Sequence, residues 1–133
     1  MGAVMTGKLL DTTVLIDLSR GHMAAADFVD AQFTLKTPLF ISVISAMEII
    51  FGCRNQLEAN KAQLLIADFN LIQLSPAESS QAYNLMLTYS KSHNLAIPDA
   101  LIAATALTYS LELATDNDRH FKMIAGLQVS RPY

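Results

Sequence analysis

Short apolar segments alternate with helix-like segments along this sequence, and the alternation limits the folds that the chain can adopt. The predicted strands are short and apolar; they span residues 8–11, 39–42, 71–74 and 111–115, with a further candidate at 126–130. The predicted helices repeat apolar residues at helical spacing; they span residues 13–19, 24–33, 43–51, 56–69 and 76–92, and the last begins at Pro98. Strands separated by helices predict an α/β layer fold with a mainly parallel sheet.

The length and composition favour one globular domain. The chain has 133 residues, of which 52% are hydrophobic and 16% are charged. This composition supplies enough apolar surface for a core and excludes a disordered chain. We therefore expect a single domain over residues 1–133, with residues 1–7 as a flexible N-terminus. The net charge of −3 argues against binding to a polyanion through bulk charge.

The sequence predicts neither a membrane span nor a disulfide framework. The best apolar stretch, PLFISVISAMEIIFG, is interrupted by Glu48 and is too short to cross a bilayer. Cys53 is the lone cysteine, which fits a reducing, cytoplasmic setting.

Two of the predicted helices carry specific expectations about burial. The amphipathic pattern of residues 56–69 predicts a buried face formed by Leu57, Leu64, Leu65 and Phe69. The next helix begins with Ser75 as its N-cap and Glu78 three positions later, which is the pattern of a capping box. We expect Glu78 to lie at the surface of that helix end.

Four acidic residues occupy positions that an ordinary surface role does not readily explain. Asp11 and Asp116 follow predicted strands, Asp99 opens the most hydrophobic helix, and Glu48 lies in the middle of an apolar helix. In open α/β sheets, ligands bind beyond the carboxyl ends of the strands, and helix starts face the same edge. We therefore expect Asp11, Asp99 and Asp116 at this edge, within reach of the long Glu48 side chain.

A cluster of carboxylates predicts a bound cation, because like charges a few ångströms apart repel each other. Oxygen ligands favour Mg²⁺ or Mn²⁺ over zinc. The histidines at 22, 93 and 120 are scattered and have no metal-ligand spacing. A water on such an ion is a suitable nucleophile for phosphodiester hydrolysis.

Each acid also has a structural explanation, and the spacing alone leaves these alternatives open. Asp11 also fits an N-cap, Asp99 a first-turn carboxylate favoured by the helix dipole, and Asp116 a turn residue. Glu48 is harder to explain in this way, because a buried unpaired carboxylate is strongly disfavoured.

Four segments of the chain, in their order, resemble the PIN-domain family, most closely the VapC-type toxins of bacterial toxin–antitoxin pairs. These segments read LLDTTVLIDLSRG, ISVISAMEIIFG, IPDALIAATAL and LATDNDRHF. The resemblance extends over about residues 8–129. It implies a three-layer PIN-like fold, in which a short, mainly parallel sheet is flanked by helices. It also implies a cytoplasmic, Mg²⁺- or Mn²⁺-dependent endoribonuclease.

The resemblance also implies roles for particular residues. The first three family acids correspond to Asp11, Glu48 and Asp99, with Asp11 and Asp99 as direct metal ligands. The fourth acid falls in the loop 115–118, where Asp116, Asn117 and Asp118 all fit; we predict Asp116 as a catalytic and metal-binding residue. Thr13 stands where many relatives have Asn.

Partners follow from the same resemblance. It implies an RNA substrate, a homodimer, and inhibition by a small VapB-like antitoxin whose segment lies over the active site. The apolar faces of residues 24–33 and 56–69 offer a groove for that segment.

Three other functions compete with the nuclease. A receiver-type signalling domain requires an acidic pair after the first strand and a phospho-accepting Asp after the third, and both are absent. A phosphatase with an aspartyl nucleophile requires an Asp where Thr13 stands. The third alternative is a catalytically weak PIN-like module that binds RNA or protein; an RNase assay separates it from the enzyme.

Overall fold

The computed structural model describes residues 7–133, in which five strands and six α-helices alternate. The strands are β1 (Lys8–Leu10), β2 (Leu39–Ser42), β3 (Asn70–Ile72), β4 (Glu112–Ala114) and β5 (Val129–Ser130). The helices are α1 (Thr12–Ser19), α2 (Met23–Thr34), α3 (Val43–Phe51), α4 (Gln56–Ile66), α5 (Pro76–His93) and α6 (Ile97–Tyr109). A 3-10 turn, η1 (Asp118–His120), follows β4. The predicted flexible segment 1–7 lies, apart from Gly7, outside the described residues.

The strands form one sheet in the order β3-β2-β1-β4-β5, and every neighbouring pair is parallel. The predicted α/β architecture is therefore confirmed. The chain begins at the centre with β1, adds β2 and β3 on one side, and then returns to add β4 and β5 on the other. This reversal makes the carboxyl ends of β1 and β4 the switch point of the sheet, where α/β proteins bind ligands.

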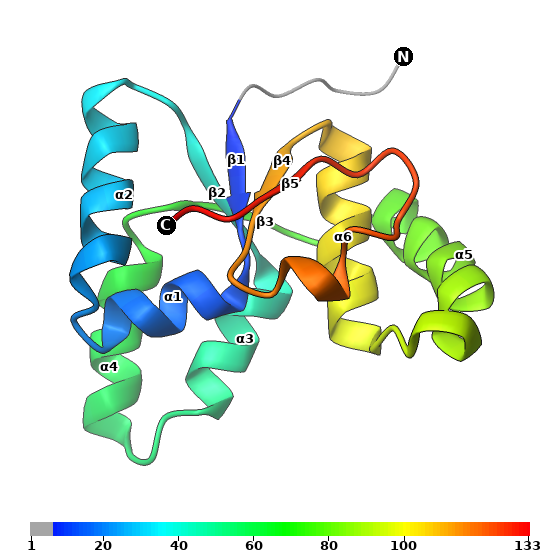
Figure 1. The fold of residues 1–133 in the computed structure, drawn as a ribbon. Helices are drawn as coiled ribbons and strands as arrows, with labels where there is room; N and C mark the ends of the chain where they lie inside the picture. The colour runs from blue at the N-terminus through cyan, green and yellow to red at the C-terminus, as the bar shows by residue number, and fades with distance from the viewer. Residues whose placement is uncertain (1–6) are drawn as a thin grey trace.

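Helices cover both faces of the sheet and complete three layers. α1, α2 and α4 lie on one side, and α5 and α6 lie on the other (Figure 1). α3 packs against α1 and α4 and also contacts α6. Two separate clusters of buried side chains fill the spaces between these layers.

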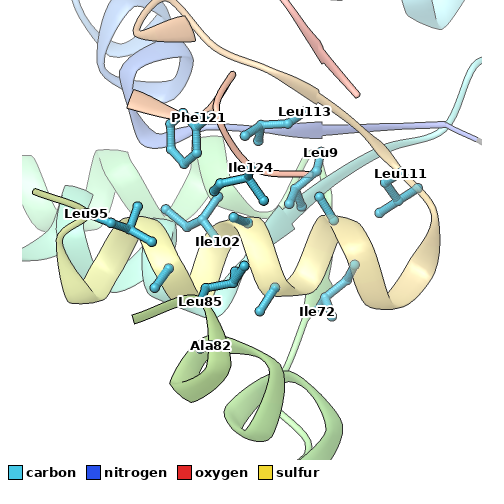
Figure 2. Close-up of a cluster of buried hydrophobic side chains, with 14 residues drawn as sticks. Leu9, Ile72, Ala82, Leu85, Leu95, Ile102, Leu111, Leu113, Phe121 and Ile124 are labelled. Atoms are coloured by element: carbon cyan, nitrogen blue, oxygen red, sulfur yellow. The ribbon is translucent and has the colours of Figure 1, made fainter. Parts of the chain in front are cut away.

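The larger buried cluster surrounds α6. Alanines and Ile102 of this helix are fully buried, as the all-round apolar pattern predicts. Figure 2 shows the side chains of Leu9, Leu113, Phe121 and Ile124 over one side of α6, with Leu85 of α5 on the other. α6 is thus held firmly from both sides, and its first turn, which carries Asp99, is fixed relative to β1 and β4.

Several predicted boundaries differ from the structure by one to three residues. β1 ends at Leu10 and α1 begins at Thr12. Asp11 is therefore the N-cap of α1, whereas the predicted strand included it. α4 ends at Ile66, three residues before the predicted end at Phe69, and β3 begins one residue before the predicted strand. Propensity patterns locate elements well and their ends poorly, because caps and turns set the ends.

The burial expectations were partly wrong. Phe69 is buried, but Leu57 and Leu64 of α4 are 64% and 74% exposed. Glu78 forms the predicted capping box with Ser75, but it is fully buried, so the expectation of a surface position was wrong. The apolar side of α4 therefore faces outward in part. Helical spacing predicts which side of a helix is apolar, but it does not predict whether another element covers that side.

No helix within the described residues 7–133 has both the length and the apolar character that a membrane crossing requires.

Candidate metal centre

The candidate site lies at the switch point of the sheet, where β1 and β4 end side by side. Asp11 follows β1 directly, and its backbone N–H donates to the carbonyl of Ala114, the last residue of β4, at 2.9 Å. Thr115 follows β4 directly. The two strand ends thus bring residues more than a hundred positions apart into contact.

The Asp11 carboxylate is buried and held by hydroxyl and amide donors. Its Oδ1 accepts a hydrogen bond from the Thr12 backbone N–H at 2.8 Å, which caps α1. Its Oδ2 accepts from the hydroxyls of Thr115 at 2.7 Å and Thr13 at 3.3 Å. Burial raises the pKa of Asp11, while the hydrogen bonds from Thr115, Thr12 and Thr13 oppose that rise. The capping explanation of Asp11 is confirmed. These three hydrogen bonds leave a lone pair on Oδ1 for a cation.

Asp99 lies in the first turn of α6, close enough to Asp11 and Glu48 for their negative charges to affect its pKa. Burial, and after it the negative charges of Asp11 and Glu48, raise its pKa to about 6. The His120 ring opposes this rise; its Nδ1 lies 3.6 Å from Asp99 Oδ2. The three acids therefore face one region of the molecule, although their positions in the sequence are far apart.

Glu48 is exposed, which contradicts the expectation of a buried carboxylate in an apolar helix. Two apolar residues near it on α3 also face outward: Met47 is 58% exposed and Phe51 is 92% exposed, whereas Ile49 is buried. Glu48 Oε1 accepts a hydrogen bond from the Thr12 hydroxyl at 2.7 Å. Thr12 Oγ1 also lies 2.9 Å from the buried Ser45 hydroxyl. Because Thr12 directly follows Asp11 in the chain, its hydrogen bond to Glu48 holds Glu48 close to Asp11.

The loop of residues 115–118, here called the fourth-acid loop, carries the fourth predicted acid. Asp116 Oδ1 pairs with Arg131 Nη2 at 2.9 Å, and Asp118 Oδ1 pairs with Arg131 Nη1 at 3.1 Å. No hydrogen bond or ion pair joins Asp116 to Asp11 or Asp99 in the described part of the chain. The assignment of Asp116 to the fourth position stays a prediction.

The three carboxylates of the candidate site suit a hard cation. Asp11, Glu48 and Asp99 offer carboxylate oxygens, and their mutual repulsion raises the pKa of Asp99, so a cation would relieve it. Within residues 7–133, no three His, Cys, Asp or Glu side chains are grouped closely enough to hold one ion as they stand. Mg²⁺ commonly retains waters among its ligands, so Glu48 would reach an ion held by the other two acids through a water.

A groove of about 820 Å³ adjoins the acids between α1, α3 and α4. Glu48 lies on its lining, whereas Asp11 and Asp99 do not. Its walls combine apolar and basic side chains; these include Ile16, Ile49, Leu65, Arg20, Arg54 and Lys61. A smaller apolar hollow lies between α3 and α4, beside Met47 and Phe51.

Sequence reasoning missed three contributors to the site. Thr115 had an available signal, since it is a polar residue directly after a buried strand at the switch point. His120 and Arg131 had no such signal. Their contacts depend on the η1 turn and on the pairing of β4 with β5, which the local sequence pattern does not fix.

Comparisons with known proteins agree with the fold and with the named segments. The PIN domain family model matches residues 8–127. Ribonuclease VapC10 of Mycobacterium tuberculosis is 38% identical over 121 residues, which are 90% of each chain. Ribonuclease VapC19 of the same organism is 32% identical over 123 residues, covering 91% of this chain and 97% of that protein.

Solved structures show the same similarity. A chain of a toxin–antitoxin complex from Klebsiella pneumoniae has a TM-score of 0.79 at 33% identity, covering 96% of this chain and 98% of that one. A chain of DNA-bound VapBC from Salmonella typhimurium has a TM-score of 0.81 at 21% identity, covering 97% and 100%, and supports the fold. With sequence and structure in agreement over nearly all of its length, this chain belongs to the PIN domain family, alongside the VapC ribonucleases.

Proposed function

We propose that this protein is an endoribonuclease toxin that hydrolyses RNA phosphodiester bonds with the help of Mg²⁺ or Mn²⁺. The observation that carries the proposal is the electrostatic coupling of Asp99 to Asp11 and Glu48 at the switch point of the sheet. The names of its relatives, which are ribonucleases, support the same reaction. The oxygen-only donor set favours Mg²⁺ or Mn²⁺ over zinc.

The acids of the cleft would hold the ion, and the threonines would hold the acids. Asp11 and Asp99 are the proposed direct ligands, and Glu48 completes the site directly or through water. When bound, the ion supplies a positive charge for the phosphate and lowers the pKa of an attacking water. The Thr12 hydroxyl donates to Glu48 and the Thr115 hydroxyl donates to Asp11, and these hydrogen bonds keep the two carboxylates in place.

Asp116 remains the proposed fourth acid. Its carboxylate is half exposed and pairs with Arg131, so it would reach an ion only by leaving that partner or by acting through a water. Its backbone N–H already donates to the Thr13 hydroxyl at 3.3 Å, which keeps the start of the fourth-acid loop beside the cleft.

An antitoxin is the proposed protein partner, since several structural neighbours are chains of toxin–antitoxin complexes. The groove between α1, α3 and α4 offers apolar walls to such a segment and leads to Glu48. A basic side chain of the antitoxin at that end would face the acids. The exposed apolar side of α3, including Met47 and Phe51, is the proposed surface for a homodimer.

The test is cleavage of a mixed pool of structured and single-stranded RNA by antitoxin-free protein, with Mg²⁺, Mn²⁺ or EDTA. We expect metal-dependent cleavage that Asp99→Asn reduces by at least a hundredfold, about the loss seen when one charged catalytic group is removed. Asp30→Asn, at an exposed position of α2, is the matched control and should cleave like the unchanged protein. Cleavage that resists EDTA, or that Asp99→Asn leaves intact, would contradict the proposed metal site. No cleavage by the metal-loaded protein would contradict the nuclease and favour a binding module.

A further inference from the structure

The Arg131 side chain bridges two carboxylates of the fourth-acid loop. Its Nη2 lies 2.9 Å from Asp116 Oδ1, and its Nη1 lies 3.1 Å from Asp118 Oδ1. The planar guanidinium presents its donors as a rigid fork, so it can hold both carboxylates at a fixed separation. A lysine, with one compact ammonium group, holds such a pair less firmly.

Arg131 projects from a backbone that is anchored on both sides. The Ser130 carbonyl accepts a hydrogen bond from the Thr115 N–H at 3.0 Å, next to the pairing of β4 with β5. Two residues after Arg131, the Tyr133 hydroxyl donates to Asp17 Oδ2 of α1 at 2.5 Å. Figure 1 shows this segment running from β5 back toward α1. A half-exposed ion pair is usually weak, but an anchored backbone lowers the entropy lost in forming it.

The fourth-acid loop is in turn connected to the Asp11 carboxylate by two short hydrogen-bond chains. The Asn117 N–H donates to the Thr115 hydroxyl at 2.9 Å, and that hydroxyl donates to Asp11 Oδ2 at 2.7 Å. The Asp116 N–H donates to the Thr13 hydroxyl at 3.3 Å, and this hydroxyl also lies 3.3 Å from Asp11 Oδ2. A shift of the loop backbone would therefore disturb both hydroxyls that orient Asp11.

We propose that Arg131 is a positioning residue of the nuclease site. It holds the fourth-acid loop in place, and the loop keeps the Asp11 carboxylate in one orientation. Arg131 itself contacts neither the substrate nor the ion in this role. The inference rests on the proposed function, because the orientation of Asp11 matters for catalysis only if the cleft hydrolyses RNA.

The first test is Arg131→Gln, compared with Arg131→Lys and with Lys91→Gln, which removes an exposed cation from α5. Amide hydrogen exchange measured by NMR reports on the Asp116 and Asn117 N–H groups. We expect both amides to exchange about threefold faster in Arg131→Gln, with partial recovery in Arg131→Lys. The kcat for RNA cleavage should fall by a similar or larger factor while KM stays nearly constant, because RNA binding is untouched. Lys91→Gln should match the unchanged protein in every measurement.

A double-mutant cycle with Asp118→Asn tests the route of the effect. Since Arg131 acts through the loop carboxylates, the double variant Arg131→Gln with Asp118→Asn should lose no more kcat than Arg131→Gln alone. Fully additive losses would overturn the inference, as would unchanged exchange at the two amides in Arg131→Gln. The exchange measurement needs no cleavage. If the amides respond but the unchanged protein cleaves no RNA, the proposed function fails, and the catalytic role of Arg131 fails with it.

Discussion

Neutralising Asp99 should stabilise the protein at neutral pH and have little effect in acid. The pKa of this carboxyl is raised from an ordinary 3.8 to about 6, first by burial and then by the charges of Asp11 and Glu48. The folded protein therefore binds a proton at Asp99 more tightly than the unfolded chain does. Its stability is highest below pH 4 on account of this group and falls as the pH rises from about 4 through 6.

The size of the effect follows from the two pKa values. The difference between 3.8 and about 6 corresponds to about 3 kcal/mol of lost stability once Asp99 is fully ionised. About 1 kcal/mol of that loss is already present at pH 4.5, because the unfolded chain is then largely ionised. Asp99→Asn removes the charge, so its gain over the unchanged protein should grow by about 2 kcal/mol between pH 4.5 and pH 7.5.

The assay is urea unfolding of both proteins at the two pH values, with EDTA present so that no divalent ion offsets the charge. Taking the difference between the two proteins cancels the titration of every other group that the substitution leaves unchanged. Asp30→Asn, an exposed carboxyl on α2, should show no such pH-dependent gain. An equal difference between Asp99→Asn and the unchanged protein at both pH values would refute the reasoning, since Asp99 would then titrate like an ordinary surface acid.

Three further substitutions test the architecture around the site by urea unfolding. Gly7→Ala should destabilise the protein by about 1 kcal/mol or more, because φ is +135° and the added Cβ would lie 2.3 Å from the Pro38 carbonyl oxygen. Thr115→Val should cost about 1–3 kcal/mol, because it removes the hydroxyl that donates to the buried Asp11 carboxylate. Phe121→Ala should cost about 3–5 kcal/mol, because this ring is fully buried against α6.

Matched controls separate these effects from general damage. The control for Gly7→Ala is Gly52→Ala, because Gly52 has an ordinary backbone conformation and no close neighbour. The control for Thr115→Val is Thr88→Val, because Thr88 lies on the exposed side of α5. The control for Phe121→Ala is Leu87→Ala, which removes a side chain that is 67% exposed. Each should change stability by less than about 0.5 kcal/mol. A control as damaging as its partner substitution would show that the named contact is not the cause.

The order of elements could be predicted from the sequence because periodicity records which residues face a core. The all-round apolar segment after Pro98 became α6, buried between the sheet and α5. The carboxyl-edge rule also led correctly to the place of Asp11 at the end of β1, since parallel strands bring their ends to one edge. The roles of these acids in metal binding and catalysis stay predictions.

Burial of partly apolar helices could not be predicted in the same way. Met47 and Phe51 of α3 and Leu57 and Leu64 of α4 are apolar residues at helical spacing, yet solvent reaches them. Periodicity shows that a helix has an apolar side, and only the packing of the other elements shows whether this chain covers it. The pairing of Arg131 with Asp116 could not be predicted for a related reason, because it depends on where β5 ends relative to β4.

The return of the chain to the centre of its sheet also sets when the candidate site can assemble during synthesis. Asp11 is synthesised early, but Thr115 and the strand beside it come near the end of the chain. A ribosome-bound chain therefore carries no assembled candidate site until β4 has left the exit tunnel and inserted beside β1.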